Sequence, residues 1–311
     1  MNRSLIKINK WLYPASWLYG AGVWLRNKMF DWGIYKEHSY DIPIICIGNI
    51  TVGGTGKTPH TEYLIRLLQK SYQVAVLSRG YKRKSKGFIL AKEDTSVKRI
   101  GDEPLQMKQK FPNIHMAVDE NRCHGIEELC KDNIASGTEV ILLDDAFQHR
   151  HVKAGLNILL VDHSRLICDD KLLPAGRLRE PESGKYRAQI VIVTKCPNYL
   201  DAWEKGKWAE ALGIRPEQSI FFTTVTYDTP AAIYDEGDPH YLYSHRLILF
   251  SGIANDKPLM KYLCSDYRIV RHFKFPDHHR FSKADIRKME SASRSFPTAV
   301  LMTTEKDCQR V

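Results

Sequence analysis

The chain of 311 residues is long enough for one large or two ordinary domains, and an apolar fraction of 43% supports a sizeable core. Its 46 Lys+Arg against 36 Asp+Glu give a net charge of +10, which suits anionic partners such as phosphorylated substrates, nucleic acid or an acidic membrane surface. The seven cysteines are scattered and form no C-x-x-C pair. This argues against a zinc site or a disulfide framework and favours reduced thiols in a cytosolic setting.

Residues 1–40 differ in composition from the rest of the chain. The run from 11 to 25 (WLYPASWLYGAGVWL) has no charged residue and is rich in tryptophan and tyrosine, with cations such as Lys10 and Arg26 on either side. It is shorter than the ~20 residues that a helix needs to span a bilayer, and no signal-peptide cleavage site follows it. We expect a helix that lies in the membrane interface. Packing of the same helix on the protein's own core is the alternative.

The strongest motif lies at residues 42–58, where an isoleucine-rich run breaks into GNITVGGTGKT. A buried strand, a glycine-rich turn, Lys-Thr and a helix make up a phosphate-binding P-loop. The backbone N–H groups of such a loop point at phosphate, the lysine reaches the β- and γ-phosphates, and the threonine hydroxyl holds Mg²⁺. Thr51 stands where the general pattern has glycine. We predict that nucleotide phosphates are bound by Thr51, Val52, Gly53, Gly54, Thr55, Gly56, Lys57 and Thr58.

A pair of acidic residues opens a predicted helix at residues 101–104 (GDEP). Asp102 fits the cap of that helix, with Glu103 and Pro104 in its first turn. It also fits a base at an active site, because a carboxylate can take the proton of a reacting hydroxyl. The residues by themselves leave both interpretations open.

A second acidic pair follows the buried strand predicted at residues 138–143 (TEVILL). Asp144 and Asp145 stand at its carboxyl end, and a carboxylate there, downstream of a P-loop, is the Walker B arrangement for Mg²⁺. Neighbouring residues of a strand point to opposite faces, so we expect the two aspartates to have different roles. We predict a Mg²⁺ site made by Thr58, Asp144 and Asp145.

Two further loops carry residues suited to binding anions or moving protons. Arg177 and Arg179 lie in the run LLPAGRLREP, where the forked donors of arginine suit phosphate; an exposed basic loop is the alternative. Asp277, His278 and His279 lie together in FPDHHRF, which suits proton transfer but also resembles a metal patch. No further His or Cys spacing supports zinc.

Continuous apolar strands alternate with helices, which predicts an α/β fold with a mostly parallel sheet covered on both faces. Such strands are expected at 74–77, 115–118, 156–162 and 190–194, and an extended connector at 221–227. A second α/β run follows, with strands at 247–250, 268–273 and 299–302. We therefore divide the chain into an N-terminal membrane-associating segment (1–40), a P-loop core (41–225) and a smaller C-terminal α/β lobe (226–311).

Taken together, these motifs resemble the tetraacyldisaccharide 4′-kinases, the lipid A kinase family. The resemblance runs in order through nearly the whole chain. The matching segments are GNITVGGTGKTP (48–59), LSRGY (77–81), GDEP (101–104), DENR (119–122), LLDDAFQHR (142–150), LLPAG with LREP (172–181), FSGIA (250–254), FPDHHRFS (275–282) and TTEKD (303–307).

The resemblance implies a P-loop core and a smaller C-terminal lobe with the site in the cleft. It implies transfer of the γ-phosphate of ATP, with Mg²⁺, to the 4′-hydroxyl of tetraacyldisaccharide 1-phosphate, which gives lipid IVA. The expected setting is the cytoplasmic face of the inner membrane, at an anionic surface and without an obligate protein partner. By the same resemblance Lys57 is catalytic, Asp102 is the base, tuned by His278 rather than His279, and Arg122 and Arg179 are phosphate ligands.

The chain departs from the family pattern at two positions and at its end. Ala146 replaces the usual glycine after the aspartate pair, and Arg177 replaces the usual proline of LPAGP. The chain stops soon after TTEKD, where family members commonly continue, so we expect a C-terminally shortened form.

Two other functions remain as alternatives. A P-loop ATPase or GTPase switch that acts on a protein partner would share the P-loop, but the strand at 190–194 ends in TKCP and lacks the aspartate of the guanine-reading N-K-x-D signature. A nucleic-acid-binding ATPase would explain the positive charge, but no nucleic-acid-binding motif supports it.

Overall fold

The computed structural model describes residues 8–232, 244–253, 255–277, 279–308 and 310–311. The chain divides into two compact units, Met1–Val225 and Thr226–Val311, which are described separately below.

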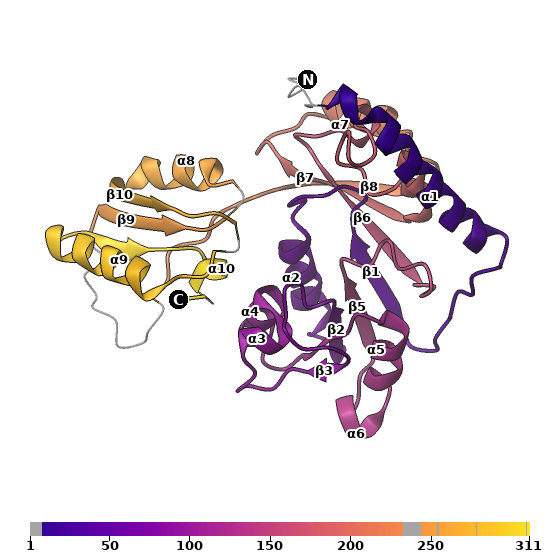
Figure 1. Ribbon diagram of the computed structural model, residues 1–311, viewed down its shortest axis with the longest axis horizontal. Helices are drawn as coiled ribbons and strands as arrows, with labels where there is room; N and C mark the ends of the chain where they lie inside the picture. Colours follow the sequence, from indigo (N-terminus) through magenta and orange to yellow (C-terminus); the bar gives the residue numbers. More distant parts are fainter. Residues whose placement is uncertain (1–7, 233–243, 254, 278, 309) are drawn as a thin grey trace. The chain divides into compact units, whose positions relative to one another are not determined.

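The N-terminal unit is built on one large sheet (Figure 1). In its described residues the sheet has eight strands in the order β3-β4-β2-β5-β1-β6-β7-β8. The paired strands are parallel, apart from the antiparallel pair β3–β4 at one edge. The strands are β1 (Ile44–Gly48), β2 (Val74–Ser78), β3 (Ile89–Leu90), β4 (His115–Val118), β5 (Val140–Asp144), β6 (Leu156–Asp162), β7 (Ile190–Cys196) and β8 (Ser219–Thr224). The predicted α/β class with a mostly parallel sheet is confirmed.

Helices cover both faces of this sheet. The helices described in this unit are η1 (Lys10–Leu12), α1 (Tyr13–Asp31), α2 (Lys57–Leu68), α3 (Val97–Ile100), α4 (Asp102–Lys110), α5 (Arg122–Leu129), α6 (Asp132–Ala135), η2 (Ile167–Asp169), η3 (Glu182–Arg187) and α7 (Ala202–Leu212). Successive residues of β2 enter opposite cores. Leu77 packs with Ile126 of α5 in one cluster, and Val76 packs with Ile65 of α2 in another. This alternation is why the strand is apolar throughout rather than at every second position.

Strand β8 differs from the expectation. The residues from 221 to 227 were expected to form an extended connector, but Ser219–Thr224 pairs with β7 as the last strand of the sheet. Its side chains are exposed or half-buried, because only one neighbouring strand covers it. An edge strand of this kind lacks the continuous apolar run that marks the central strands in the sequence.

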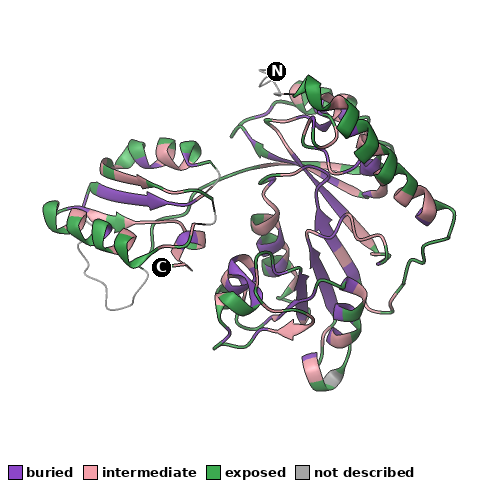
Figure 2. Ribbon diagram, viewed as in Figure 1, coloured by how far each residue is buried: buried purple, intermediate pink, exposed green. Residues whose placement is uncertain are grey.

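Helix α1 has its large apolar side chains on the outside. The face toward the body is mixed in composition: Ser16 and Phe30 are buried, and the half-buried residues are Tyr13, Gly20, Val23, Arg26, Asn27, Lys28 and Met29. Trp17 is 73% exposed, Leu18 78% and Trp24 53%, and Figure 2 shows most of the helix as exposed. Among the described residues, no helix combines the length and apolar character needed to cross a membrane.

The C-terminal unit is a smaller α/β layer. Its described strands are β9 (Arg246–Ser251), β10 (Arg268–Lys274) and β11 (Val300–Met302), and they form a parallel sheet in the order β10-β9-β11. Its helices are α8 (Lys257–Asp266), α9 (Lys283–Ser295) and α10 (Glu305–Cys308). Leu247 and Leu249 of β9 form the core with Leu263 of α8. Ser282 and Asp285 make a capping box that fixes the start of α9.

The end of β1 tests how closely this core is packed. A Cβ atom on Gly48 would lie 2.6 Å from Cβ of Phe147 and 3.0 Å from its backbone nitrogen. Gly48→Ala should therefore lower the free energy of unfolding by about 2–3 kcal/mol, since backbone has to move to admit the methyl group. The control is Gly155→Ala, whose Cβ would meet its nearest neighbour at an ordinary 3.7 Å. Urea denaturation compares the two, and equal stabilities would contradict the close approach at Gly48.

Candidate active site

The loop between β1 and α2 has the backbone of a phosphate-binding loop. Gly53 and Gly56 have φ values of 115° and 85°, in the left-handed region that favours glycine. Gly56 is the N-cap of α2, so Lys57 and Thr58 begin the helix and its first N–H groups face the loop. Two hydrogen bonds to Thr55 stabilise the loop, one from Asn49 within it and one from Thr194 on β7. Asn49 Nδ2 lies 2.6 Å from Thr55 Oγ1, and Thr194 Oγ1 donates to the Thr55 carbonyl at 2.9 Å.

Thr51, the departure from the general pattern, is buried and paired with a distant segment. Residues 170–180, here called the strap, run alongside the loop. Thr51 forms an antiparallel bridge with Leu178, Val52 N donates to the Arg177 carbonyl at 2.8 Å, and Arg179 N donates to the Ile50 carbonyl at 2.7 Å. The start of the loop is thus a short piece of extended backbone. A β-branched residue suits extended backbone better than glycine does, which explains why threonine can replace glycine at position 51.

Asp145 lies between two cations that come from different parts of the chain. Its Oδ2 is 3.6 Å from Lys57 Nζ, and its Oδ1 accepts from Arg179 Nη2 at 3.0 Å. Burial acts to raise the pKa of Asp145, but Lys57 and Arg179 outweigh it and hold the pKa below its ordinary value. The φ of Asp145 is 48°, an uncommon conformation for a residue other than glycine. Lys57, Asp145 and Arg179 therefore form one charge cluster.

Asp144 has the opposite environment. It is buried on the last position of β5 and accepts hydrogen bonds from Thr61 Oγ1 and Ser78 Oγ, each at 3.2 Å. Burial, then the negative charges of Glu103 and Asp145, raise its pKa to about 6. The two aspartates thus differ in environment, and the local excess of negative charge lies on Asp144.

Asp102 is placed by the turn at Gly101, which packs on the loop after β2. Gly101, not Asp102, is the N-cap of α4, so Asp102 is the first helical residue, and it is buried. Gly101 has a φ of 94°, and a Cβ there would lie 3.0 Å from the Tyr81 carbonyl. The GDEP turn therefore packs against the loop after β2. Ser78, the last residue of β2, donates to Asp144, so the loop after β2 and the turn packed on it lie at the same end of the sheet as the aspartate pair.

The guanidinium of Arg122 is buried, and two of its nitrogens have no hydrogen-bond partner among the described residues. Its side chain donates to the Asp119 carbonyl, whereas Nε and Nη2 have no hydrogen-bond partner among the described residues. Burial lowers the pKa of Arg122 to about 10. Burial, then the charges of Arg122, Arg79 and Arg26, lower the pKa of His149 to about 4, so His149 is neutral at pH 7. Unsatisfied buried donors among several arginines are what an anion site requires.

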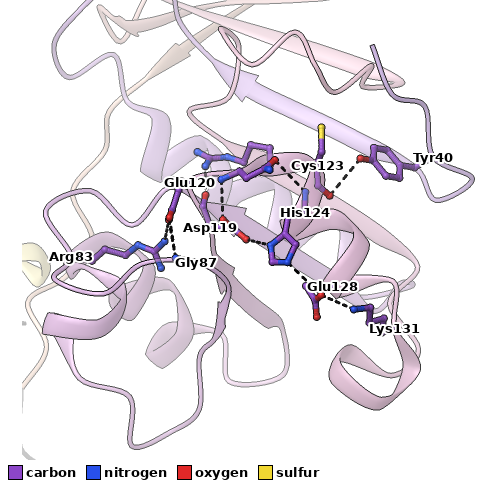
Figure 3. Close-up of polar contacts among 11 residues, drawn as sticks. Tyr40, Arg83, Gly87, Asp119, Glu120, Cys123, His124, Glu128 and Lys131 are labelled. Atoms are coloured by element: carbon purple, nitrogen blue, oxygen red, sulfur yellow. Dashed lines mark hydrogen bonds and ion pairs between the residues drawn. The ribbon is translucent and has the colours of Figure 1, made fainter. Parts of the chain in front are cut away.

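A polar network fixes the start of α5 and hence Arg122 (Figure 3). Asp119 is 1% exposed and accepts from Asn121 N at 2.9 Å and from the ring of His124 at 2.7 Å. Asn121 caps the helix by accepting from His124 N. Glu120, next to it, binds Arg83 and Gly87 N. The acidic residues of DENR therefore position the arginine.

The comparisons with known proteins agree with this geometry. Residues 8–311 match the family model for tetraacyldisaccharide-1-P 4′-kinase. The chain belongs to this family. Over its full length it is 58% identical to a tetraacyldisaccharide 4′-kinase of Phocaeicola vulgatus and covers 87% of that protein. It is 46% identical to one of Flavobacterium johnsoniae, with 98% of the chain and 88% of the relative covered.

A solved structure extends the match to the fold. LpxK from Aquifex aeolicus, crystallised with ATP, is 29% identical, with a TM-score of 0.72 over 96% of this chain and 89% of that one. The predicted family and the predicted enzyme class, a kinase that acts on a hydroxyl, are both confirmed.

The structure brings together most of the residues predicted from sequence, but not all of them. Asp145 pairs with both Lys57 and Arg179, and the Asp102 turn packs on the loop after β2 at the same end of the sheet. His278 lies outside the described residues. His279 belongs to the C-terminal unit, where its ring stacks on Phe275 and its Nε2 lies 3.1 Å from Asp285. The roles predicted for these residues stay predictions.

Sequence reasoning missed Lys195. Its Nζ binds the Gly54 carbonyl and Asp162, the latter at 2.6 Å, so it ties the phosphate loop to the end of β6. It lies in the TKCP run that was considered only for its lack of a guanine-reading aspartate. The available signal was its position at the carboxyl end of a parallel strand, where ligand sites gather.

The contrast between the two aspartates predicts opposite effects of pH on stability. The pKa of Asp144 rises from 3.8 to about 6 on folding, so the folded state binds more protons than the unfolded state between these values. Its contribution to the free energy of unfolding therefore falls as pH rises through this window. Asp144→Asn should raise the free energy of unfolding at pH 7.5 by roughly 1–3 kcal/mol and flatten this decline.

Asp145→Asn is the contrasting variant. The lowered pKa of Asp145 stabilises the fold above its unfolded pKa, and this contribution is lost as pH falls through the folded pKa. The variant should therefore be less stable than the wild type at pH 7.5. Urea denaturation between pH 4 and pH 8, with EDTA present, measures both variants. Destabilisation by Asp144→Asn at pH 7.5 would contradict the assigned environment.

Proposed function

We propose that this chain transfers the γ-phosphate of ATP to the 4′-hydroxyl of tetraacyldisaccharide 1-phosphate and so produces lipid IVA. One observation carries the proposal: the phosphate-loop lysine, the Walker B aspartate and a strap arginine form one charge cluster at the end of the sheet where the turn that carries Asp102 also lies. Phosphoryl transfer depends mainly on positioning and charge stabilisation. Membership of the kinase family and the ATP in the related LpxK crystal structure support the choice of donor.

The nucleotide phosphates are assigned to the loop from Thr51 to Thr58. Its N–H groups and the start of α2 favour negative charge, and Lys57 supplies a cation at the phosphates. Arg179 reaches the same place, because its side chain contacts both Thr51 and Asp145. The free donors of Arg122 are assigned to a further anionic oxygen of the nucleotide or of the acceptor.

Mg²⁺ is assigned to Thr58, Asp144 and Asp145, and the residues present fit it. No group of three or more His, Cys, Asp and Glu gathers in the described part of the chain, but Mg²⁺ takes one or two carboxylates and completes its shell with phosphates and water. Burial, then the charges of Glu103 and Asp145, raise the pKa of Asp144, and a divalent cation would stabilise its ionised form. When bound, Mg²⁺ would neutralise charge on the β- and γ-phosphate oxygens.

Asp102 is assigned as the base that takes the proton of the sugar hydroxyl. The carboxylate is buried at the first position of α4, beside the loop after β2. His278, which lies in the second lobe, is assigned to tune it.

Helix α1 is assigned to the membrane interface on the cytoplasmic side, where ATP is present and the leaflet is anionic. Trp17, Leu18 and Trp24 are exposed, and tryptophan favours the depth of the lipid headgroups. The net charge of +10 favours an anionic surface and an anionic substrate. No protein partner is needed for this attachment.

The activity is tested with γ-labelled ATP, Mg²⁺ and tetraacyldisaccharide 1-phosphate in detergent micelles. We expect label in the lipid and little release of inorganic phosphate. Rapid phosphate release without labelled lipid would overturn the proposal and favour the ATPase switch.

The base is tested by Asp102→Asn. Loss of a general base should lower kcat by about 10²–10⁴-fold while the Kd for ATP stays within about threefold of the wild type. Asp94→Asn, at an exposed turn, is the matched control and should keep wild-type kinetics. An equal loss of ATP binding and kcat would mean that Asp102 serves only to shape the helix start.

The membrane assignment is tested by replacing outward side chains of α1. Trp17→Gln and Trp24→Gln should each weaken binding to vesicles that contain anionic phospholipid by about tenfold or more, because each removes apolar area from the interface. Tyr72→Gln removes an exposed aromatic residue after α2 and is the control. Flotation with vesicles measures the binding. Unchanged flotation of both tryptophan variants would contradict the assignment.

A further inference from the structure

The strap has a second partner besides the phosphate loop, namely helix α1 together with Asn9 just before it. Tyr19 Oη donates to the Arg179 carbonyl at 2.7 Å, Ser16 Oγ donates to the Leu172 carbonyl at 2.8 Å, and Asn9 N donates to the Ala175 carbonyl at 2.9 Å. A Cβ on Gly20 would lie 2.8 Å from Leu172 Cδ1, so the helix backbone approaches the strap closely. The strap is thus held between α1 and the phosphate loop.

Arg179 contacts both α1 and the phosphate loop. Its carbonyl accepts from Tyr19, and its N–H donates to the Ile50 carbonyl at 2.7 Å. Its guanidinium donates to the Thr51 carbonyl at 3.0 Å and to Asp145 at 3.0 Å. A shift of the Arg179 backbone would therefore move a support of the phosphate loop and a partner of the Walker B aspartate together.

We propose that Tyr19 is a positioning residue for the nucleotide site and acts through Arg179. The helix uses its aromatic residues in two ways. Trp17 and Trp24 present their rings to the exterior, whereas the hydroxyl of Tyr19 points back to the strap. The hydrogen bond fixes the carbonyl of Arg179 and hence the direction in which its side chain leaves the strap. The segment assigned to the membrane therefore also sets the geometry of the phosphate loop.

The proposal differs from simple docking of the helix in what it predicts for ATP. If the bond only docks α1, its loss lowers thermal stability or vesicle binding and leaves the affinity for ATP unchanged. If it positions Arg179, its loss weakens ATP binding while the helix stays attached through its other contacts. Only the kinetic part of the test rests on the proposed kinase function.

The test uses Tyr19→Phe in the full chain, which removes the hydroxyl and keeps the ring. The Kd for a fluorescent ATP analogue, measured by titration with Mg²⁺ in detergent, should rise about three- to tenfold, the effect of one hydrogen bond. The KM for ATP should rise in parallel, and vesicle binding should stay within about twofold because the ring remains. Tyr35→Phe is the control; its ring packs on Phe30 and His151.

Two further variants test whether Tyr19 acts through the strap and Arg179. Ser16→Ala removes the bond to Leu172 and should weaken ATP binding in the same direction. In an Arg179→Ala background, Tyr19→Phe should change the Kd by less than about twofold, because the side chain that it positions is gone. An undiminished effect of Tyr19→Phe in that background would show that Tyr19 does not act through Arg179.

The outcome that overturns the proposal is a Tyr19→Phe protein with wild-type Kd and KM for ATP, whatever its melting temperature or vesicle binding. Absence of lipid phosphorylation by the wild type would instead overturn the proposed kinase function. The titration with the ATP analogue would then still decide the role of Tyr19.

Discussion

The ion pairs of Asp145 with Lys57 and Arg179 are the interaction on which the rest of the site depends. They exist because β1 and β5 are neighbours in a parallel sheet, with Ile47 opposite Asp144, so the phosphate loop and the aspartate pair leave the sheet at the same point. A half-buried carboxylate requires compensating charge. One cation comes from the loop itself and the other from the strap, more than a hundred residues later. The cluster therefore joins three segments that no local preference would bring together.

Asp144, unlike Asp145, has no ion pair among the described residues. Asp145 has two cations beside it, whereas Asp144 accepts from two hydroxyl groups, and burial, then the charges of Glu103 and Asp145, raise its pKa to about 6. A site of this kind is poor for stability and suited to a divalent cation. The unsatisfied donors of Arg122 are the complementary feature, since they call for an anion. A carboxylate suited to a cation and a guanidinium suited to an anion at one site are consistent with a metal–nucleotide complex as the natural ligand.

Features encoded by neighbouring residues could be predicted from the sequence, whereas contacts between segments far apart in the chain could not. The glycines of the phosphate loop, the aspartates after β5 and the GDEP turn are local signals, because backbone conformation and strand ends are encoded by neighbouring residues. The pairing of Thr51 with the strap, the tie from Lys195 to Gly54 and the burial of Asp119 were not predicted, because each joins segments whose contact follows only from the fold. Strand β8 was missed for a related reason. An edge strand with one neighbour does not need a continuous apolar run.

Helix α1 shows where composition and structure answer different questions. Composition indicated an interfacial segment, but it could not say which side of the helix would meet the protein. The close approach at Gly20 excludes a larger side chain at that position, and Ser16 and Tyr19 bind the strap through their hydroxyl groups. The tryptophans are consequently left outside, where water alone would not favour them. The helix contacts the strap through Ser16, Tyr19 and Gly20 and presents Trp17, Leu18 and Trp24 to the exterior, so one helix serves both the attachment assigned to it and the support of the phosphate loop.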